Sequence, residues 1–484
     1  MNNMKKILFI SIAGMLITGT GCKKFLGQEP DNRTTVTSAD QVKQLLVSAY
    51  PKLSYFAFTE PMTDNAEDKG VTEPGLDPDL AKTNLQSFLY QEVEATGNDT
   101  PEGYWAAAYK AIASANHALD VIEKSPNKIA LNALKGEALV ARAYAHFMLV
   151  TLFSKAYDPA TAASDPGIPY VTSPEKVVFG QYERKTVQYV YDMIEKDLTG
   201  GIPLIEDKSY GDALKFHFNQ KAANGFASRF YLFKRDYAKA VAAADKAIAN
   251  TSAVASDLRP WQPTYVNLQP ADIRLEYTKS TEPANLLIQE QATNWVSGVY
   301  AFVRYGLYSD VYDIVLNGPN VTGGTLVIGY RTFGAQPRYY NVPKFFSSNG
   351  YSTHTLITSE EVLFNRAEAN LALKNNAAVL TDLNAWASRN VRNYNATTHA
   401  ITEQKAAAFW GQSVDASLLS TILFFKRAAF IHEGMRWFDI TRLKIPVTHK
   451  TVDGQTITLG PNDNRRVLQI PAEVRLSGME QNPR

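Results

Sequence analysis

The sequence predicts a mainly α-helical protein in which helix pairs are joined to long irregular segments and a few short strands. Three observations support this fold class. Apolar residues recur at helical spacing over several segments. Some of these segments follow one another after only a few polar residues, as in helix pairs. Two long stretches between the helical blocks have no helical period and are rich in Pro, Gly and aromatic residues.

The first two predicted helices cover residues 104–122 and 131–153. In the first of them Trp105 and Ile112 fall on one apolar stripe, and in both segments small residues alternate with large ones. This alternation favours close packing of two helices. The Pro- and Gly-rich segment 158–169 ends the block and predicts a loop.

Further helices are predicted at residues 186–198, 220–233, 237–249, 359–373, 377–390 and 418–433. Two neighbouring pairs of these segments have the texture of a tetratricopeptide repeat, with large and then small residues at helical spacing after a tight polar turn. The spacing between the pairs is irregular. We therefore expect scattered helix pairs rather than a regular solenoid.

Two stretches, residues 50–100 and 250–358, lack helical periodicity. Irregular segments of this length inside a compact domain are uncommon and are usually functional. Short strands are expected at residues 286–291, 325–330 and 456–459. The β component should therefore be minor, and the irregular stretches are the natural place to look for a ligand site.

The composition excludes several classes of function. The 49 basic and 48 acidic residues give a net charge of +1, which removes the electrostatic argument for a nucleic-acid partner. One Cys and seven His offer no zinc cluster, and no phosphate-binding loop, dinucleotide fingerprint or nucleophile elbow is present. We expect no metal and no cofactor. Paired carboxylates stay open as an alternative, but no motif marks such a pair.

The N-terminus has the pattern of a bacterial lipoprotein signal. Lys5 and Lys6 precede an apolar run at residues 7–17, small residues fill positions 18–21, and the single cysteine, Cys22, follows. We expect residues 1–21 to be a signal peptide and Cys22 to carry the lipid. The apolar run is too short for a permanent membrane span. The mature protein is thus expected to be anchored to a membrane.

Several different short motifs occur in order along the chain: Cys22 to Leu26, Ala115-Asn116, Gly136 to Ala138 with Arg142 to Tyr144, Tyr237 to Ala240, Glu361 to Leu363 with Arg366 to Ala369, Arg427 to Asp439, and Ile470-Pro471 with Gln481 to Pro483. In this order they resemble the SusD/RagB family of outer-membrane lipoproteins from Bacteroidetes. The resemblance covers nearly the whole chain. It implies one SusD-like domain at 22–484, with an N-terminal part of about 22–215 and a C-terminal RagB/SusD part of about 216–484 that form one compact unit.

The resemblance also implies an architecture and a role. Family members have four tetratricopeptide-like helix pairs, the SusD-like α-α superhelix, and an irregular remainder that carries the ligand site. They are not enzymes. They sit at the outer membrane, usually on the cell surface, and deliver nutrient to a SusC-like TonB-dependent transporter. Their usual ligands are starch-like and other oligosaccharides or polysaccharides, while a RagB-like minority takes peptides. Both ligand classes, and a purely structural assembly role, stay open here.

A sugar-binding surface needs aromatic faces for stacking and polar groups for the hydroxyls. The irregular stretches contain both kinds of residue, and Trp295 ranks first among them. The candidate ligand contacts are Trp295, Tyr300, Trp261, Tyr265, Arg304, Asp64 and Asn65. For the aromatic residues the competing interpretation is packing beneath a long loop. Asp64 and Asn65 lie roughly where the family often places polar ligand contacts.

The motif at residues 434–439 invites a functional interpretation, but a structural one is simpler. Trp437 and Phe438 stand beside a predicted helix end, where core packing explains them. Arg436 and Asp439 have opposite charges and are close in sequence. We therefore predict a buried or half-buried ion pair between Arg436 and Asp439.

Overall fold

The computed structural model describes residues 38–175, 182–296, 299–328, 330–331, 340–348 and 350–484. Residues Ala39–Arg484 form one compact unit, to which the following description applies. The predicted signal peptide, residues 1–21, and the predicted lipidation site, Cys22, lie outside the described residues. Within the described part of the chain, no helix combines the length and the apolar character that crossing a membrane requires.

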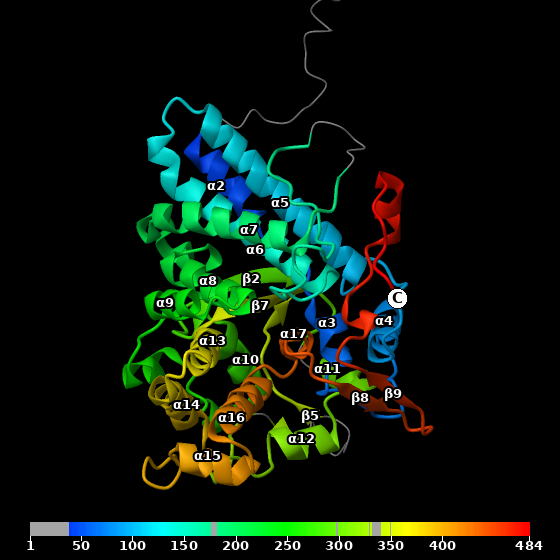
Figure 1. Ribbon diagram of the computed structural model, residues 1–484, viewed down its shortest axis with the longest axis vertical. Coiled ribbons are helices and arrows are strands. Elements are labelled where there is room, and N and C mark those ends of the chain that lie inside the picture. The colour runs from blue at the N-terminus through cyan, green and yellow to red at the C-terminus, as the bar shows by residue number, and fades with distance from the viewer. Residues whose placement is uncertain (1–37, 176–181, 297–298, 329, 332–339, 349) are drawn as a thin grey trace, which may run out of the picture. The chain divides into compact units, whose positions relative to one another are not determined.

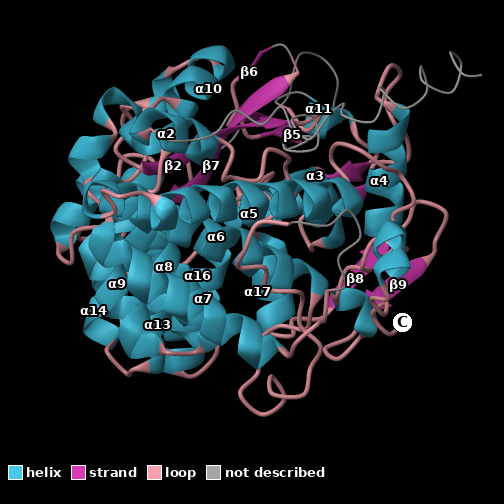
Figure 2. Cartoon of the chain, turned by 90° about the horizontal axis from the view of Figure 1, so that it is seen from above, coloured by secondary structure: helices cyan, strands magenta, loops and turns pink. Residues whose placement is uncertain are grey.

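Helices make up most of this unit, and the predicted mainly α fold with helix pairs is confirmed. Figure 2 shows the strands confined to short segments among the helices. The helices that the sequence predicted are α5 (Pro101–Lys124), α6 (Asn132–Phe153), α7 (Val187–Gly201), α8 (Gln220–Lys234), α9 (Tyr237–Ala247), α13 (Ser359–Ala372), α14 (Asn376–Asn390) and α16 (Val414–Ala429).

Antiparallel neighbours pack in pairs along one side of the unit (Figure 1). Helix α5 packs on α6, and α6 packs on α7; the pairs α8–α9 and α13–α14 follow, and α13 contacts α9 and α16. The glycines Gly136 in α6 and Gly201 in α7 permit the closest of these approaches. A Cβ atom on Gly136 would lie 2.8 Å from the carbonyl oxygen of Gly201, so any side chain there would separate the two helices.

Most of the predicted helices begin where a capping side chain satisfies a free amide group, although α6 and α16 have no such side-chain cap. Thr100 accepts a hydrogen bond from the backbone N–H of Gly103 at 3.1 Å, and Pro101 occupies the first position of α5. Asn219 accepts from the N–H of Ala222 at 2.9 Å at the start of α8. These local signals explain why the predicted boundaries lie close to those observed.

The structure adds helices that the sequence did not predict: α2 (Ala39–Val47), α3 (Phe56–Thr59), α4 (Pro78–Phe88), α10 (Pro270–Thr278), α11 (Val299–Phe302), α12 (Ser309–Val315), α15 (Glu403–Trp410) and α17 (Arg436–Arg442). Five of them lie inside the two stretches for which no helical period was found, and α3 and α11 are single turns. Helix α15 packs against α16 and completes another helix pair. Short helices carry too few residues for a periodic signal.

The strands form small antiparallel sheets: β2 (Asn285–Ala292) with β7 (Tyr351–Thr358) and β6 (Ser347–Ser348), β1 (Glu67–Asp68) with β3 (Tyr305–Gly306), β4 (Tyr330–Arg331) with β5 (Tyr340–Asn341), and β8 (Val447–Lys450) with β9 (Thr456–Leu459). The strands predicted at 286–291 and 456–459 are confirmed. The strand predicted at 325–330 is wrong over most of its length, because Leu326 forms only an isolated bridge with Val391.

The last predicted helix ends earlier than expected. Helix α16 stops at Ala429 because the chain then turns through left-handed backbone at His432 and Gly434, and α17 begins after this turn. Trp437 and Phe438 are buried, as predicted.

The predicted Arg436–Asp439 ion pair is wrong. Arg436 donates to the carboxylate of Asp64, and Asp439 accepts from Lys426 and Arg442.

Candidate ligand-binding site

The best-ranked sequence candidate, Trp295, lies in the core. Its side chain is 0% exposed, and its indole N–H donates to the carbonyl oxygen of His432 at 2.9 Å. Tyr300 stacks on the imidazole of His432 with 4.0 Å between ring centroids, and its hydroxyl donates to the carbonyl oxygen of Val342. The prediction that these two rings form an open stacking surface is corrected, because both are packed beneath the irregular stretch.

Trp261 and Tyr265 are also buried. Their rings meet edge to face with centroids 5.3 Å apart, and the Tyr265 hydroxyl donates to the carboxylate of Glu282 at 2.7 Å. The expectation that they face a ligand is corrected for the same reason. A long irregular segment has no periodic apolar face, so its large rings supply its core.

Asp64 and Asn65 tie the first irregular stretch to the end of the chain. Asp64 accepts two hydrogen bonds of 2.9 Å from Arg436, and the side-chain oxygen of Asn65 accepts from Arg427 at 2.7 Å. Burial raises the pKa of Asp64, but the charges of Arg427 and Arg436 outweigh burial and lower this pKa to about 2. Asn65 is buried, whereas 28% of the Asp64 side chain is exposed, and their role as ligand contacts stays a prediction.

Arg304 is the most accessible of the predicted contacts. Its guanidinium makes two hydrogen bonds, of 2.7 and 2.8 Å, to the carboxylate of Asp68, and part of the side chain remains exposed. The bond joins the two irregular stretches next to the β1–β3 pair. Arg304 thus holds two loops together, and it does not line the cavity described next.

A cavity of about 510 Å³ lies where the two irregular stretches and the β6–β7 hairpin meet, and we name it the loop cavity. Its lining includes Asp77, Asn294, Val296, Phe302, Ser347 and Ser348. Asn294 and Val296 are the two neighbours of Trp295. The predicted segment therefore lines this cavity, but the side chains that reach the cavity are those beside the tryptophan.

A buried carboxylate, that of Asp99, bonds two residues that line the loop cavity, Thr293 and Asn294. Asp99 accepts hydrogen bonds from the hydroxyl of Thr293 and, at 2.6 Å, from the backbone N–H of Asn294. Burial raises the pKa of Asp99 to about 6, although both hydrogen bonds oppose the shift. These bonds fix the start of the 293–302 segment, so the polar groups of Thr293 and Asn294 keep defined positions at the cavity.

Exposed aromatic side chains stand on the hairpin beside this cavity. Tyr351 is 55% exposed and Phe346 is 41% exposed. Tyr351 is paired with Ser348 on one side and with Ala292 on the other. Directly paired residues of antiparallel strands face the same side of the sheet, so the Tyr351 ring lies next to Ser348, which lines the cavity.

The sequence analysis missed these two residues, although a signal was present. The dipeptide Asn349-Gly350 is a strong sequence signature of a hairpin turn, and aromatic residues flank it on both sides. An aromatic residue next to such a turn stands at the tip of a sheet, where one face is open to solvent.

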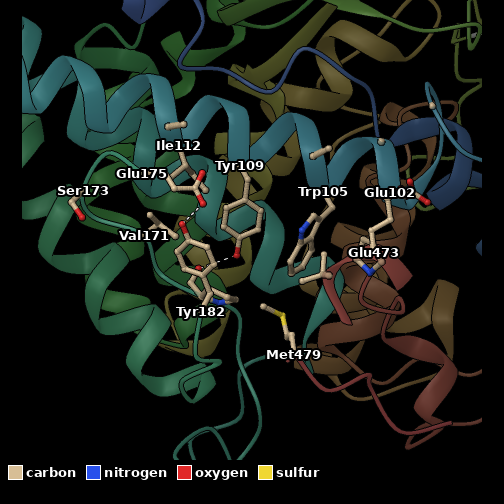
Figure 3. Close-up of a pocket in the computed structure, with 17 residues that line it drawn as sticks. Glu102, Trp105, Tyr109, Ile112, Val171, Ser173, Glu175, Tyr182, Glu473 and Met479 are labelled. Atoms are coloured by element: carbon tan, nitrogen blue, oxygen red, sulfur yellow. Dashed lines mark hydrogen bonds between the residues drawn. The ribbon is translucent and has the colours of Figure 1, made fainter. Parts of the chain in front are cut away.

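A second cavity, of about 520 Å³, lies along α5 and is lined by Trp105, Tyr109 and Tyr182 together with three glutamates (Figure 3). Trp105 was expected in the core, and with 6% of its surface exposed it is nearly buried. The two cavities differ in chemistry. The loop cavity is lined mainly by hydroxyl, amide and apolar groups with one carboxylate, that of Asp77, whereas the second cavity combines a tryptophan and two tyrosines with three carboxylates.

Comparison with known proteins agrees with this architecture. Residues 24–232 match a SusD-like family model described as starch-binding and associating with the outer membrane. The N-terminal part of the chain is thus similar to SusD-like proteins. No curated protein sequence matches the chain.

Solved structures share the fold of this chain. A SusD superfamily protein from Bacteroides thetaiotaomicron VPI-5482 is 20% identical, with a TM-score of 0.70 over 93% of this chain and 100% of its own. One from Bacteroides vulgatus ATCC 8482 is 19% identical, with a TM-score of 0.69 over 92% and 99%. A laminarin-binding SusD-like protein is 16% identical, with a TM-score of 0.59 over 92% and 97%.

Proposed function

We propose that this protein binds an oligosaccharide or polysaccharide at the loop cavity, without catalysing a reaction on it. The family description as starch-binding and the laminarin-binding structural relative support a glycan as the ligand. The observation that carries the proposal for this chain is the exposed ring of Tyr351 beside the cavity. Its apolar face is available for stacking on the C–H groups of a pyranose ring.

The polar lining favours a neutral polyol over a peptide. Asn294, Ser347 and Ser348 are exposed and line the loop cavity, where hydroxyl and amide groups can bond sugar hydroxyls. Among the described lining residues Asp77 is the one ionisable side chain, and it already accepts from the N–H of Leu80 at 3.0 Å. A pocket for peptides would be expected to offer charged partners for the peptide ends and side chains.

The binding test uses the mature chain, residues 22–484, with Cys22→Ala to prevent acylation. Affinity gel electrophoresis against a panel of polysaccharides should show retardation by at least one glycan. With that glycan, Tyr351→Ala should weaken binding about fivefold, because one stacking contact is worth about 1 kcal/mol. The matched control is Tyr189→Ala, which removes a tyrosine that is 40% exposed on α7 and leaves the cavity intact.

Two outcomes contradict the proposal. Binding of casein peptides, with no retardation by any glycan of the panel, would favour the peptide-binding alternative. Glycan binding that is unchanged in both Tyr351→Ala and Phe346→Ala would place the glycan site elsewhere on the molecule.

We further propose that the protein is held at the cell surface by a lipid on Cys22 and hands its ligand to a SusC-like TonB-dependent transporter. The lipoprotein-type N-terminus and the family's association with the outer membrane support this role. Affinity purification of the tagged protein from detergent-solubilised membranes should recover a TonB-dependent transporter of this type. Purification without such a partner would contradict the delivery role while leaving glycan binding in place.

A further inference from the structure

The second cavity, which we name the α5 cavity, is separate from the proposed glycan site. Its described lining residues and those of the loop cavity have no member in common. One wall is the N-terminal half of α5, and the others come from residues 169–175, from Tyr182 and from residues 471–479 (Figure 3). A volume of about 520 Å³ is in the range of small-molecule sites.

Aromatic groups form the body of the α5 cavity. Trp105 and Tyr109 are one helical turn apart, with ring centroids 5.0 Å apart, and Figure 3 shows both rings projecting from the same side of α5. The Tyr109 hydroxyl donates to the carbonyl oxygen of Pro169 at 2.9 Å, and the Tyr182 hydroxyl donates to Glu175. Because both hydroxyl groups are bonded within the protein, what these residues offer a ligand is their ring surface.

The charged groups of the α5 cavity all have the same sign. Glu102, Glu175 and Glu473 line it, and the described lining contains no Lys, Arg or His. The whole chain has equal numbers of acidic and basic residues to within one, so this local excess does not follow from composition. Figure 3 shows Glu102 and Glu473 near one another at the Trp105 end, with Glu175 at the opposite end.

The two carboxylates at the Trp105 end lack a counter-ion in the described part of the chain, where neither takes part in an ion pair. Partial burial raises the pKa of Glu102, and the negative charge of Glu473 raises it further. Their mutual repulsion would be relieved by a positive group placed between them. An anion in the same position would add to the repulsion.

We propose that the α5 cavity binds a small organic cation in which an ammonium or guanidinium group is attached to an apolar body. The positive group would lie between Glu102 and Glu473, near the Trp105 ring, and the apolar body would lie along Tyr109 and Ile112. Aromatic rings attract cations through their negative faces, and carboxylates at the rim add direct charge pairing. This inference does not depend on glycan binding at the loop cavity.

The test compares three probes of similar shape and different charge: phenethylammonium, 2-phenylethanol and 3-phenylpropionate. Isothermal titration calorimetry at low ionic strength, with the mature Cys22→Ala chain, should give binding about tenfold tighter for the cation than for the alcohol. The anion should bind more weakly than the alcohol. The double variant Glu102→Gln with Glu473→Gln should bring the cation to within about twofold of the alcohol.

Two further variants separate the cavity from general charge effects. Glu206→Gln with Glu276→Gln removes two exposed carboxylates outside the cavity and should leave the cation preference unchanged. Ala106→Trp places a large side chain at a position that lines the cavity and is exposed, so it should abolish binding of all three probes with little effect on unfolding.

Three results would overturn the proposal: no heat of binding with phenethylammonium at millimolar concentration, equal affinity for the cation and the alcohol, or a cation preference that persists in the Glu102/Glu473 double variant. Glycan retardation measured on the same variants distinguishes an effect on the α5 cavity from an effect on the loop cavity. Loss of cation binding with glycan retardation intact is the expected pattern, and failure of glycan binding alone would concern only the loop cavity.

Discussion

Trp295→Ala is expected to destabilise the protein strongly, because the substitution empties a fully buried site. The indole is 0% exposed and its N–H is bonded to the carbonyl oxygen of His432. Truncation of a core tryptophan costs roughly 3–5 kcal/mol, and the loss includes a carbonyl group left without its donor. We expect the free energy of unfolding to fall by about 4 kcal/mol.

The assay is urea unfolding followed by far-ultraviolet circular dichroism, which does not depend on the fluorescence of the removed tryptophan. Trp295→Phe keeps a ring but loses the hydrogen bond, and should cost about half as much. Tyr351→Ala is the matched comparison at the surface, with an expected change below about 0.5 kcal/mol. Stability and binding should therefore separate, with Trp295 affecting mainly unfolding and Tyr351 mainly glycan affinity.

Unchanged unfolding of Trp295→Ala would refute this reasoning. It would mean that the ring makes no net packing contribution, as for a side chain at an open surface. In that case Trp295 would return as a direct ligand contact, and the assignment of the loop cavity to its sequence neighbours would have to be withdrawn.

Gly434→Ala should lower the free energy of unfolding by about 3 kcal/mol, because φ is +65° and a Cβ would lie 2.0 Å from Thr59 Oγ1. The control Gly411→Ala, with φ +64° and open space around it, should lower it by only about 1 kcal/mol in the same assay. Equal costs would contradict the close contact. Asp64 has a lowered pKa, so its carboxylate stabilises the fold above its ordinary pKa of 3.8, and about 2 kcal/mol should be lost as the pH falls toward 2. Asp64→Asn should flatten the pH dependence of unfolding over this range, and an unaltered slope would count against the ion pairs. Cys22→Ala should move the protein from the membrane fraction to the soluble fraction on immunoblots, whereas continued membrane association would contradict lipid anchoring.

Local sequence signals were sufficient for the long helices but not for the direction of side chains in the irregular stretches. Helix α8 was predicted at 220–233 and observed at Gln220–Lys234, because its apolar period and its Asn219 cap are both local. Trp295 had no such local determinant. Its burial depends on His432, 137 residues later in the chain, and a single sequence contains no record of that contact.

The direction of the exposed Tyr351 ring was also not predictable from local sequence signals. The residue follows a hairpin signal that the sequence contains, but which face of the sheet the ring occupies depends on its pairing with Ala292 and Ser348. A shift of one residue in that register would turn the ring toward the core. Strand register depends on contacts across the sheet, so the candidate site required the structure while the fold class did not.

One buried cluster connects the features of the proposed glycan site. Glu60 accepts hydrogen bonds from the backbone N–H groups of His432 and Gly434, at 2.9 and 2.8 Å. The carbonyl oxygen of His432 accepts a hydrogen bond from the indole N–H of Trp295, and its imidazole ring stacks on the ring of Tyr300. His432, in the turn after α16, thus contacts both irregular stretches: Glu60 belongs to the first stretch and Trp295 to the second. These contacts fix Trp295, whose neighbours Asn294 and Val296 line the loop cavity. Differences in glycan preference should then arise at the exposed rim, and substitutions of Tyr351 should change which glycan binds without changing the core beneath it.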